Sequence, residues 1–121
     1  MNVLIVEDDP TDLKLAASIL IAEGHLVAIA QSAEIALRLL ADNQPHLILT
    51  DLELPGMDGV ALVRRLKLSP VTANIPVVAV TAFPERLPSR KTQREAGFAA
   101  FITKPIDPHG FPALLVAASR H

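Results

Sequence analysis

Charged and hydroxyl side chains follow directly after the apolar segments of this chain. The segments and the residues that follow them are Val3–Val6 with Glu7, Asp8 and Asp9, His46–Thr50 with Asp51, Val77–Val80 with Thr81, and Phe98–Thr103 with Lys104. If the segments are parallel strands, their carboxyl ends meet at one edge of a sheet. We therefore expect these scattered residues to converge into one site.

The residue types at this edge indicate phosphoryl transfer. Clustered carboxylates repel one another and are costly to keep ionised without a cation. Oxygen ligands favour a hard ion, and Mg²⁺ is often held by one or two carboxylates together with a phosphate. Lys104 adds a positive charge and Thr81 a hydroxyl donor for phosphoryl oxygens. A metal-bound aspartate such as Asp51 can itself become an acyl phosphate, with Mg²⁺ as the cofactor.

Strands and helices are expected to alternate along the chain. The expected strands are Val3–Val6, Leu26–Ala30, His46–Thr50, Pro76–Val80 and Phe98–Ile102. Helical patterns cover Pro10–Glu23, the segment between the Ser32 cap and Asn43, Gly59–Leu68, Ser89–Gly97 and Phe111–Ser119. Prolines at the start of the last two patterns predict that these helices are short. This alternation predicts one doubly wound α/β domain with a parallel sheet over residues 1–121.

Composition narrows the class of protein. The 121 residues are half apolar, which is enough for one domain with a core. With 13 acidic and 11 basic residues the chain lacks the basic excess that binding to nucleic acid usually needs. The absence of cysteine excludes disulfides and thiolate metal sites. The first apolar stretch, Met1–Val6, is too short for a signal peptide or membrane anchor, so we expect a cytoplasmic protein.

Four segments resemble the signatures of receiver domains of two-component response regulators. They are Val3–Pro10 (VLIVEDDP), Asp51–Gly59 (DLELPGMDG), Val80–Ala82 (VTA) and Thr103–Ile106 (TKPI). Four motifs in the right order at strand ends are far more specific than any one of them. The resemblance covers essentially the whole chain. It implies the flavodoxin-like receiver fold, with five helices around a sheet of strand order 2-1-3-4-5.

The resemblance implies an Mg²⁺ site around the phosphoacceptor. Asp51 would accept the phosphoryl group, and Asp8 would be a direct metal ligand. Glu7 would act mainly through metal-bound water, and the backbone carbonyl of Glu53 would be a further ligand. The adjacent Asp9 suits an N-cap of the first helix better than a metal ligand.

The resemblance also implies a conformational switch. Lys104 and Thr81 would form the catalytic pair that senses the phosphoryl group, and Phe101 occupies the position of the rotating switch aromatic. By composition alone, a phenylalanine on a strand is more often a core residue. The Lys104–Pro105 bond would be cis. The four histidines show no metal-ligand spacing and are interpreted as solvated surface residues.

The partners follow from the same resemblance. A sensor histidine kinase or a histidine phosphotransfer protein would donate the phosphoryl group, and the chain would switch its binding face toward a downstream protein that the sequence does not identify. The chain would catalyse its own phosphorylation and, with Phe83 bordering the approach of water, a slow dephosphorylation, rather than turn over other substrates. We expect a monomer or weak homodimer without an output domain, although a cut from a longer regulator is equally consistent with the sequence.

Three other functions compete with this interpretation. The Asp51-x-Glu53 pattern faintly resembles the nucleophile motif of haloacid-dehalogenase-type phosphatases, but the chain is short and Glu53 replaces the second aspartate. A flavodoxin-like flavin carrier would share the fold class, yet the chain has neither Trp nor Tyr to flank the flavin. A receiver that binds proteins without being phosphorylated would not need the complete set of residues found here.

Overall fold

The computed structural model describes residues 1–87 and 89–120, and its centre is a parallel sheet. The strands are β1 (Asn2–Val6), β2 (Leu26–Ala30), β3 (Leu47–Asp51), β4 (Val77–Thr81) and β5 (Ala100–Thr103). Their order in the sheet is β2-β1-β3-β4-β5, as predicted. All residues of β3 and β4 are buried, which explains why these strands are continuous apolar runs rather than alternating ones.

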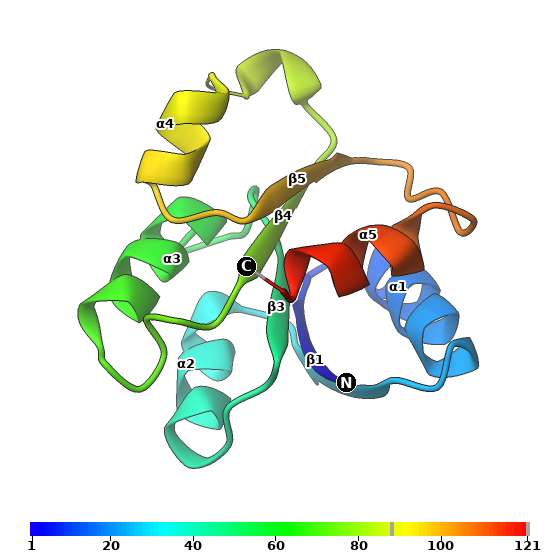
Figure 1. Cartoon of the computed structure of the whole chain (residues 1–121), viewed down its shortest axis with the longest axis horizontal. Helices are drawn as coiled ribbons and strands as arrows, with labels where there is room; N and C mark the ends of the chain where they lie inside the picture. The colour runs from blue at the N-terminus through cyan, green and yellow to red at the C-terminus, as the bar shows by residue number, and fades with distance from the viewer. Residues whose placement is uncertain (88, 121) are drawn as a thin grey trace.

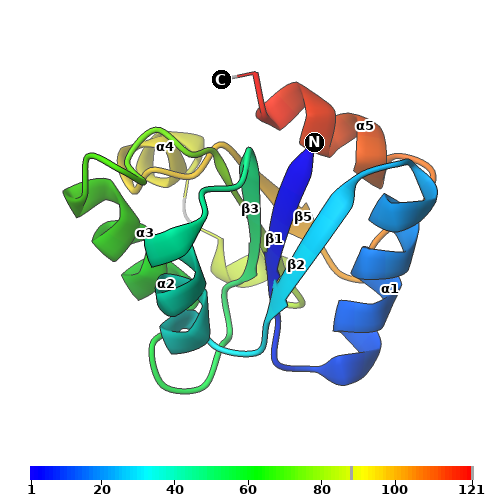
Figure 2. The ribbon, with the colours of Figure 1, turned by 90° about the horizontal axis from the view of Figure 1, so that it is seen from below.

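Helices cover both faces of the sheet (Figures 1 and 2). They are α1 (Pro10–Ala22), α2 (Ala33–Asp42), α3 (Gly59–Leu68), α4 (Arg90–Glu95) and α5 (Phe111–Ala118), with a 3-10 turn, η1 (Pro84–Arg86), before α4. One core joins α1 and α5 to the sheet through residues such as Leu20 and Leu115. A second core joins α2 and α3 to the other face through residues such as Leu40 and Leu62. The doubly wound architecture is therefore confirmed.

Three strands were predicted one or two residues too early in the sequence. β3 begins at Leu47 rather than His46 and includes Asp51, and β4 ends at Thr81 rather than Val80. β5 begins two residues later than predicted, because Gly97 turns the chain at φ +99° and Phe98 is buried in the core before pairing starts. Apolar runs mark burial, whereas the ladders continue to the polar residues at the strand ends.

The region before α4 also differs from the prediction. The helix spans Arg90–Glu95, with Ser89 as its N-cap, instead of Ser89–Gly97. Pro84 opens the separate turn η1, which the sequence did not predict, and Pro88 lies outside the described residues. A proline has no N–H for a helix ladder but suits a first turn, so it divides this segment.

Gly59 makes a close contact that positions the loop after β3. A Cβ at this position would lie 2.5 Å from the backbone oxygen of Asp51 and 2.9 Å from the Cα of Leu52. We expect Gly59→Ala to lower the free energy of unfolding by about 2 kcal/mol, because backbone atoms must move to admit the methyl group. Urea denaturation measures the change. Gly110→Ala, where the nearest atom is a side-chain oxygen at 3.4 Å, is the control; equal losses in both variants would contradict the prediction.

Candidate functional site

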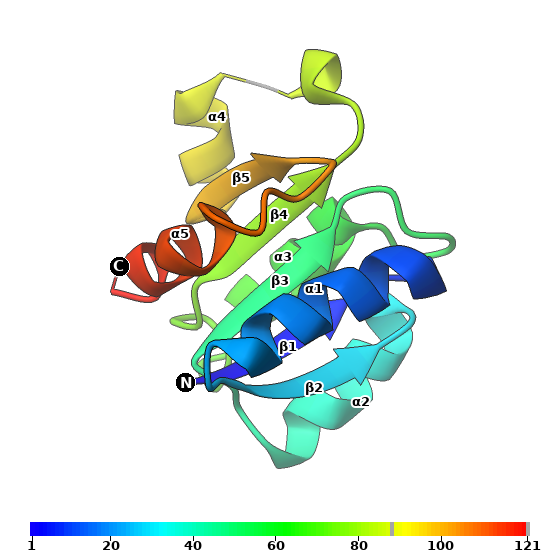
Figure 3. The same ribbon diagram turned by 90° about the vertical axis from the view of Figure 1, so that its right-hand side faces the viewer.

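The carboxyl ends of the parallel strands lie at one edge of the sheet (Figure 3), and four of these strands end on or just before a polar residue. Glu7 follows β1, Asp51 and Thr81 end β3 and β4, and Lys104 follows β5. Glu7, Asp51 and Thr81 are only 5%, 6% and 2% exposed. Burying such groups is costly unless they are paired, so their convergence indicates a built site rather than surface chance.

Three carboxylates form the acidic part of this site. One oxygen each of Glu7, Asp8 and Asp51 lies within 4.8 Å of the others. Glu7 and Asp51 are buried, whereas Asp8 is exposed and leaves the group open to solvent on its side. Oxygen ligands with an open side suit Mg²⁺, which keeps several of its waters. The residues therefore fit the predicted metal, while the Glu53 carbonyl remains a predicted ligand.

Lys104 contacts three carboxylates, two of which belong to the acidic group. Its ammonium donates to Glu7 Oε1 at 2.7 Å, to Asp51 Oδ2 at 3.0 Å and to Asp12 Oδ2 at 3.0 Å. Burial alone would lower the pKa of Lys104, but these three hydrogen bonds outweigh it and raise the pKa above its ordinary value. Lys104 therefore stays charged across the physiological range.

Asp12 is a member of the site that the sequence interpretation missed. It lies in the first turn of α1, four residues after Asp8, and contacts Lys104 across 92 positions of sequence. An aspartate in a first helical turn is ordinarily explained by the helix dipole. Asp8 precedes α1, which begins at Pro10 after the Asp9 cap, so no helical spacing links Asp12 to the acidic cluster and the sequence carried no signal for its contact with Lys104.

Glu7 has a strongly displaced proton affinity. Burial raises the pKa of Glu7 from its ordinary 4.5 to about 7; the hydrogen bond from Lys104 lowers it, and the Asp51 carboxylate raises it further. Near neutral pH the Glu7 carboxyl of the metal-free site is therefore partly protonated and loses its proton as the pH rises. A bound divalent cation would favour the ionised form and displace that proton.

The displaced pKa predicts how stability changes with pH in EDTA. Native Glu7 binds its proton more tightly than in the unfolded chain, so this contribution is full below pH 4.5 and is lost as the pH rises through about 7. Relative to Glu7→Gln, the wild type should lose on the order of 3 kcal/mol of unfolding free energy across that window. Urea denaturation of both proteins at several pH values measures this. Parallel pH profiles would show that Glu7 titrates normally.

Thr81 is held by Glu53 in this structure. The Thr81 hydroxyl donates to Glu53 Oε1 at 2.6 Å and accepts the backbone N–H of Phe83 at 3.0 Å. The backbone N–H of Glu53 donates to Asp51 Oδ1 at 3.1 Å. Glu53 thus contacts both the phosphoacceptor candidate and the hydroxyl candidate, and the sequence interpretation predicted neither contact.

The two candidate aromatic residues, Phe101 and Phe83, have different surroundings. Phe101 on β5 is half-buried, and its ring centroid lies 4.8 Å from that of Phe98, which is part of the core. Phe83 is 37% exposed, and the Arg86 guanidinium lies 4.1 Å from its ring centroid. Phe101 therefore has a packing role in this conformation, and the proposed rotation remains a prediction.

Asp9 caps α1, as predicted. Its Oδ1 accepts the backbone N–H groups of Thr11 and Asp12 at 2.8 and 3.2 Å. We therefore expect Asp9→Ala to cost about 1 kcal/mol of unfolding free energy with little effect on Mg²⁺ affinity. Asp8→Ala should weaken Mg²⁺ binding at least tenfold with little effect on stability. Calorimetric Mg²⁺ titration and urea denaturation of both variants separate these effects; the reverse pattern would place the metal ligand one residue later.

Of the described histidines, His46 and His109 are exposed, as predicted, whereas His25 is half-buried. The Nδ1 atom of His25 lies 3.1 Å from the terminal ammonium of Met1, and His46 Nδ1 accepts the backbone N–H of Asn2 at 2.8 Å. His121 lies outside the described residues. In the described part of the chain no histidine joins a group able to hold a metal.

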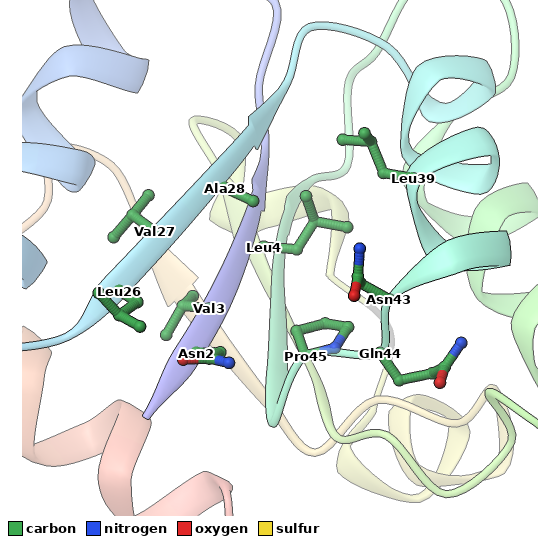
Figure 4. A pocket seen from close by; sticks show the side chains of 10 residues that line it. All are labelled: Asn2, Val3, Leu4, Leu26, Val27, Ala28, Leu39, Asn43, Gln44 and Pro45. Carbon is green, nitrogen blue, oxygen red and sulfur yellow. The ribbon is translucent and has the colours of Figure 1, made fainter.

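A surface hollow lies away from the carboxylates of the candidate site. It encloses about 340 Å³ and is lined by residues that include Asn2, Leu26, Leu39 and Pro45 (Figure 4). These residues come from the starts of β1 and β2 and the end of α2, at the amino edge of the sheet. This hollow is therefore separate from the candidate site.

Among residues 1–87 and 89–120, no helix combines the length and apolar character needed to cross a membrane.

Comparisons with known proteins agree with this arrangement. The family model of the response regulator receiver domain matches residues 3–115. The response regulator PleD of Caulobacter vibrioides is 40% identical over 106 residues, which cover 88% of this chain and 23% of PleD. The polar-differentiation response regulator DivK of Brucella ovis is 36% identical over 105 residues, which cover 87% of this chain and 85% of DivK. The chain thus spans most of DivK but under a quarter of PleD.

A solved structure has the same fold. The receiver domain of sensor histidine kinase PA1611 from Pseudomonas aeruginosa PAO1 matches with a TM-score of 0.87 and 23% identity, covering 99% of this chain and 98% of that one. That domain has a magnesium ion coordinated in its active-site cleft.

Proposed function

Because the chain belongs to the response regulator receiver domain family, we propose that residues 1–121 form one receiver domain in which Asp51 is the phosphoacceptor. Phosphoryl acceptance on an aspartate is the general function of this family. The observation that supports Asp51 is its position at the end of β3, buried, beside two other carboxylates and the Lys104 ammonium. Membership of this family excludes the two alternative functions considered above, a flavin carrier and a phosphatase of the haloacid-dehalogenase type.

The hydrogen bonds of Asp51 prepare it as a nucleophile. Oδ1 accepts the Glu53 backbone N–H and Oδ2 accepts Lys104, so the carboxylate is held in one orientation. A carboxylate oxygen would form the new bond to phosphorus while the bond from phosphorus to the donor nitrogen breaks, and the electron pair leaves with that nitrogen. Such a transfer depends mainly on positioning and charge neutralisation.

Glu7, Asp8, Asp51 and the Glu53 carbonyl would hold the Mg²⁺ ion. Bound Mg²⁺ supplies positive charge that offsets repulsion between these carboxylates and an anionic donor. Lys104 and the hydroxyl of Thr81 would then bind phosphoryl oxygens. For Thr81 this requires release of its hydrogen bond to Glu53, and the movement would make room for Phe101 to turn inward.

The proposed donors are a sensor histidine kinase or a histidine phosphotransfer protein, acting in the cytoplasm. The output is a changed protein-binding face, presented by a monomer or weak homodimer. The domain would promote its own phosphorylation and a slow dephosphorylation. Support for the slow loss comes from Phe83, whose exposed ring, stacked with Arg86, offers no hydrogen bond to orient an attacking water.

Acetyl phosphate with and without Mg²⁺ tests this function. The expected result is an Mg²⁺-dependent mass increase of one phosphoryl group, stable in acid and removed by hydroxylamine, which maps to Asp51. Failure to form any adduct at saturating Mg²⁺ would instead favour a receiver that binds proteins without phosphorylation.

A further inference from the structure

The ammonium of Lys104 has no hydrogen left for a phosphoryl oxygen in this structure. A lysine ammonium carries three donors, and those of Lys104 are directed to Glu7, Asp12 and Asp51 at 2.7, 3.0 and 3.0 Å. A phosphoryl oxygen can therefore accept a hydrogen bond from Lys104 only if one of the three carboxylates gives up its own. The chemistry of the site depends on which one does.

Asp12 is the carboxylate that can leave at the lowest cost. Its side chain is 38% exposed, whereas those of Glu7 and Asp51 are each 7% exposed. Released Asp12 can be hydrated by solvent, while a buried carboxylate that loses its cation keeps its desolvation penalty. Glu7 is held further by the Asp9 backbone N–H at 3.2 Å, and Asp51 is itself the proposed point of phosphoryl attachment.

We propose that Asp12 is a positioning residue, which binds Lys104 in the resting state and gives up this contact to an arriving phosphoryl oxygen. This inference rests on the proposed function, because it assumes that a phosphoryl group occupies the site at Asp51. Asp12 acts through Lys104 rather than on the phosphoryl group itself. The strength of the Asp12–Lys104 ion pair sets the free energy that is lost before Lys104 can bind a phosphoryl oxygen.

The two ligands of the site should respond to Asp12 in opposite directions. Its negative charge favours Mg²⁺ at the adjacent carboxylates, but it repels an anionic phosphoryl group and competes with it for Lys104. Asp12→Asn keeps the size of the side chain and removes the charge. We expect Mg²⁺ to bind about threefold more weakly and beryllofluoride, at saturating Mg²⁺, about threefold more tightly, as suits a partly exposed ion pair.

Titration calorimetry on the full chain tests this pair of shifts, with urea denaturation as a check on folding. Asp9→Asn is the matched control, since it removes one nearby charge, can still cap α1 and has no contact with Lys104. Weaker binding of both ligands in Asp12→Asn would mean a structural role and overturn the inference, as would unchanged binding or equal shifts in the control. A wild-type protein that binds no beryllofluoride with Mg²⁺ would instead overturn the proposed function.

Discussion

Asp51→Asn should abolish formation of the acyl phosphate, with labelling by acetyl phosphate falling to the background of the assay. The amide occupies nearly the same volume but cannot attack phosphorus. Asp51 accepts from Glu53 and Lys104 on separate oxygens, and the single amide oxygen of asparagine can keep one of these hydrogen bonds. Glu7 and Asp12 still bind Lys104, so the fold should persist. Intact-protein mass spectrometry after incubation with acetyl phosphate and Mg²⁺ measures the effect.

The control for this substitution is Asp58→Asn. Asp58 lies on the same loop, is exposed and caps α3 by accepting the backbone N–H of Ala61 at 2.8 Å, which asparagine can also do. The Asp58→Asn protein should be phosphorylated to the same extent as the wild type. Undiminished labelling of a folded Asp51→Asn protein would show that another residue is the acceptor.

Lys104→Met should have the largest effect on stability in the absence of metal. Methionine fills a similar volume, but it leaves the buried carboxylates of Glu7 and Asp51 without their cation. Removing one partner of a buried ion pair costs about 3 kcal/mol. Urea denaturation in EDTA should show this loss, and millimolar Mg²⁺ should recover much of it by supplying the missing positive charge.

Lys67→Met is the matched control for this rescue. Lys67 is half-buried, and its ammonium donates to the carbonyls of Ala73 and Ile75 at 2.9 and 3.4 Å rather than to carboxylates. Its replacement should destabilise the protein to an extent that Mg²⁺ does not change. Equal recovery of both variants by Mg²⁺ would show a general salt effect instead of a charge replaced in the site.

The sequence carried enough information to predict the layers of the fold and the edge where the site lies. Buried parallel strands read as uninterrupted apolar runs, so their ends are visible as abrupt changes to polar residues such as Glu7 and Asp51. The caps Asp9 and Ser32 were equally visible, because their preference is local. Strand bounds were less accurate, since pairing with a neighbour rather than apolarity decides where a ladder ends.

The side-chain contacts within the site were not predictable in the same way. Asp12 reaches Lys104 because α1 presents its first turn toward the end of β5, which depends on how helix and sheet pack. Glu53 bonds Thr81 because the loop after β3 passes beside the end of β4. Contacts of this kind join residues far apart in the sequence, and residue type and spacing carry little information about them.

The direction of the chain through the sheet has a practical consequence for protein engineering. All five strands run in parallel from the amino edge to the edge that carries Asp51, and α5 returns from that edge to the other. Figure 3 accordingly shows the start of β1 and the end of α5 on the left, the side opposite to the carboxyl ends of the strands. An affinity tag, a fluorescent label or a surface tether fused at either end would therefore sit on the far side of the molecule and leave unobstructed room for a protein donor to dock over Asp51.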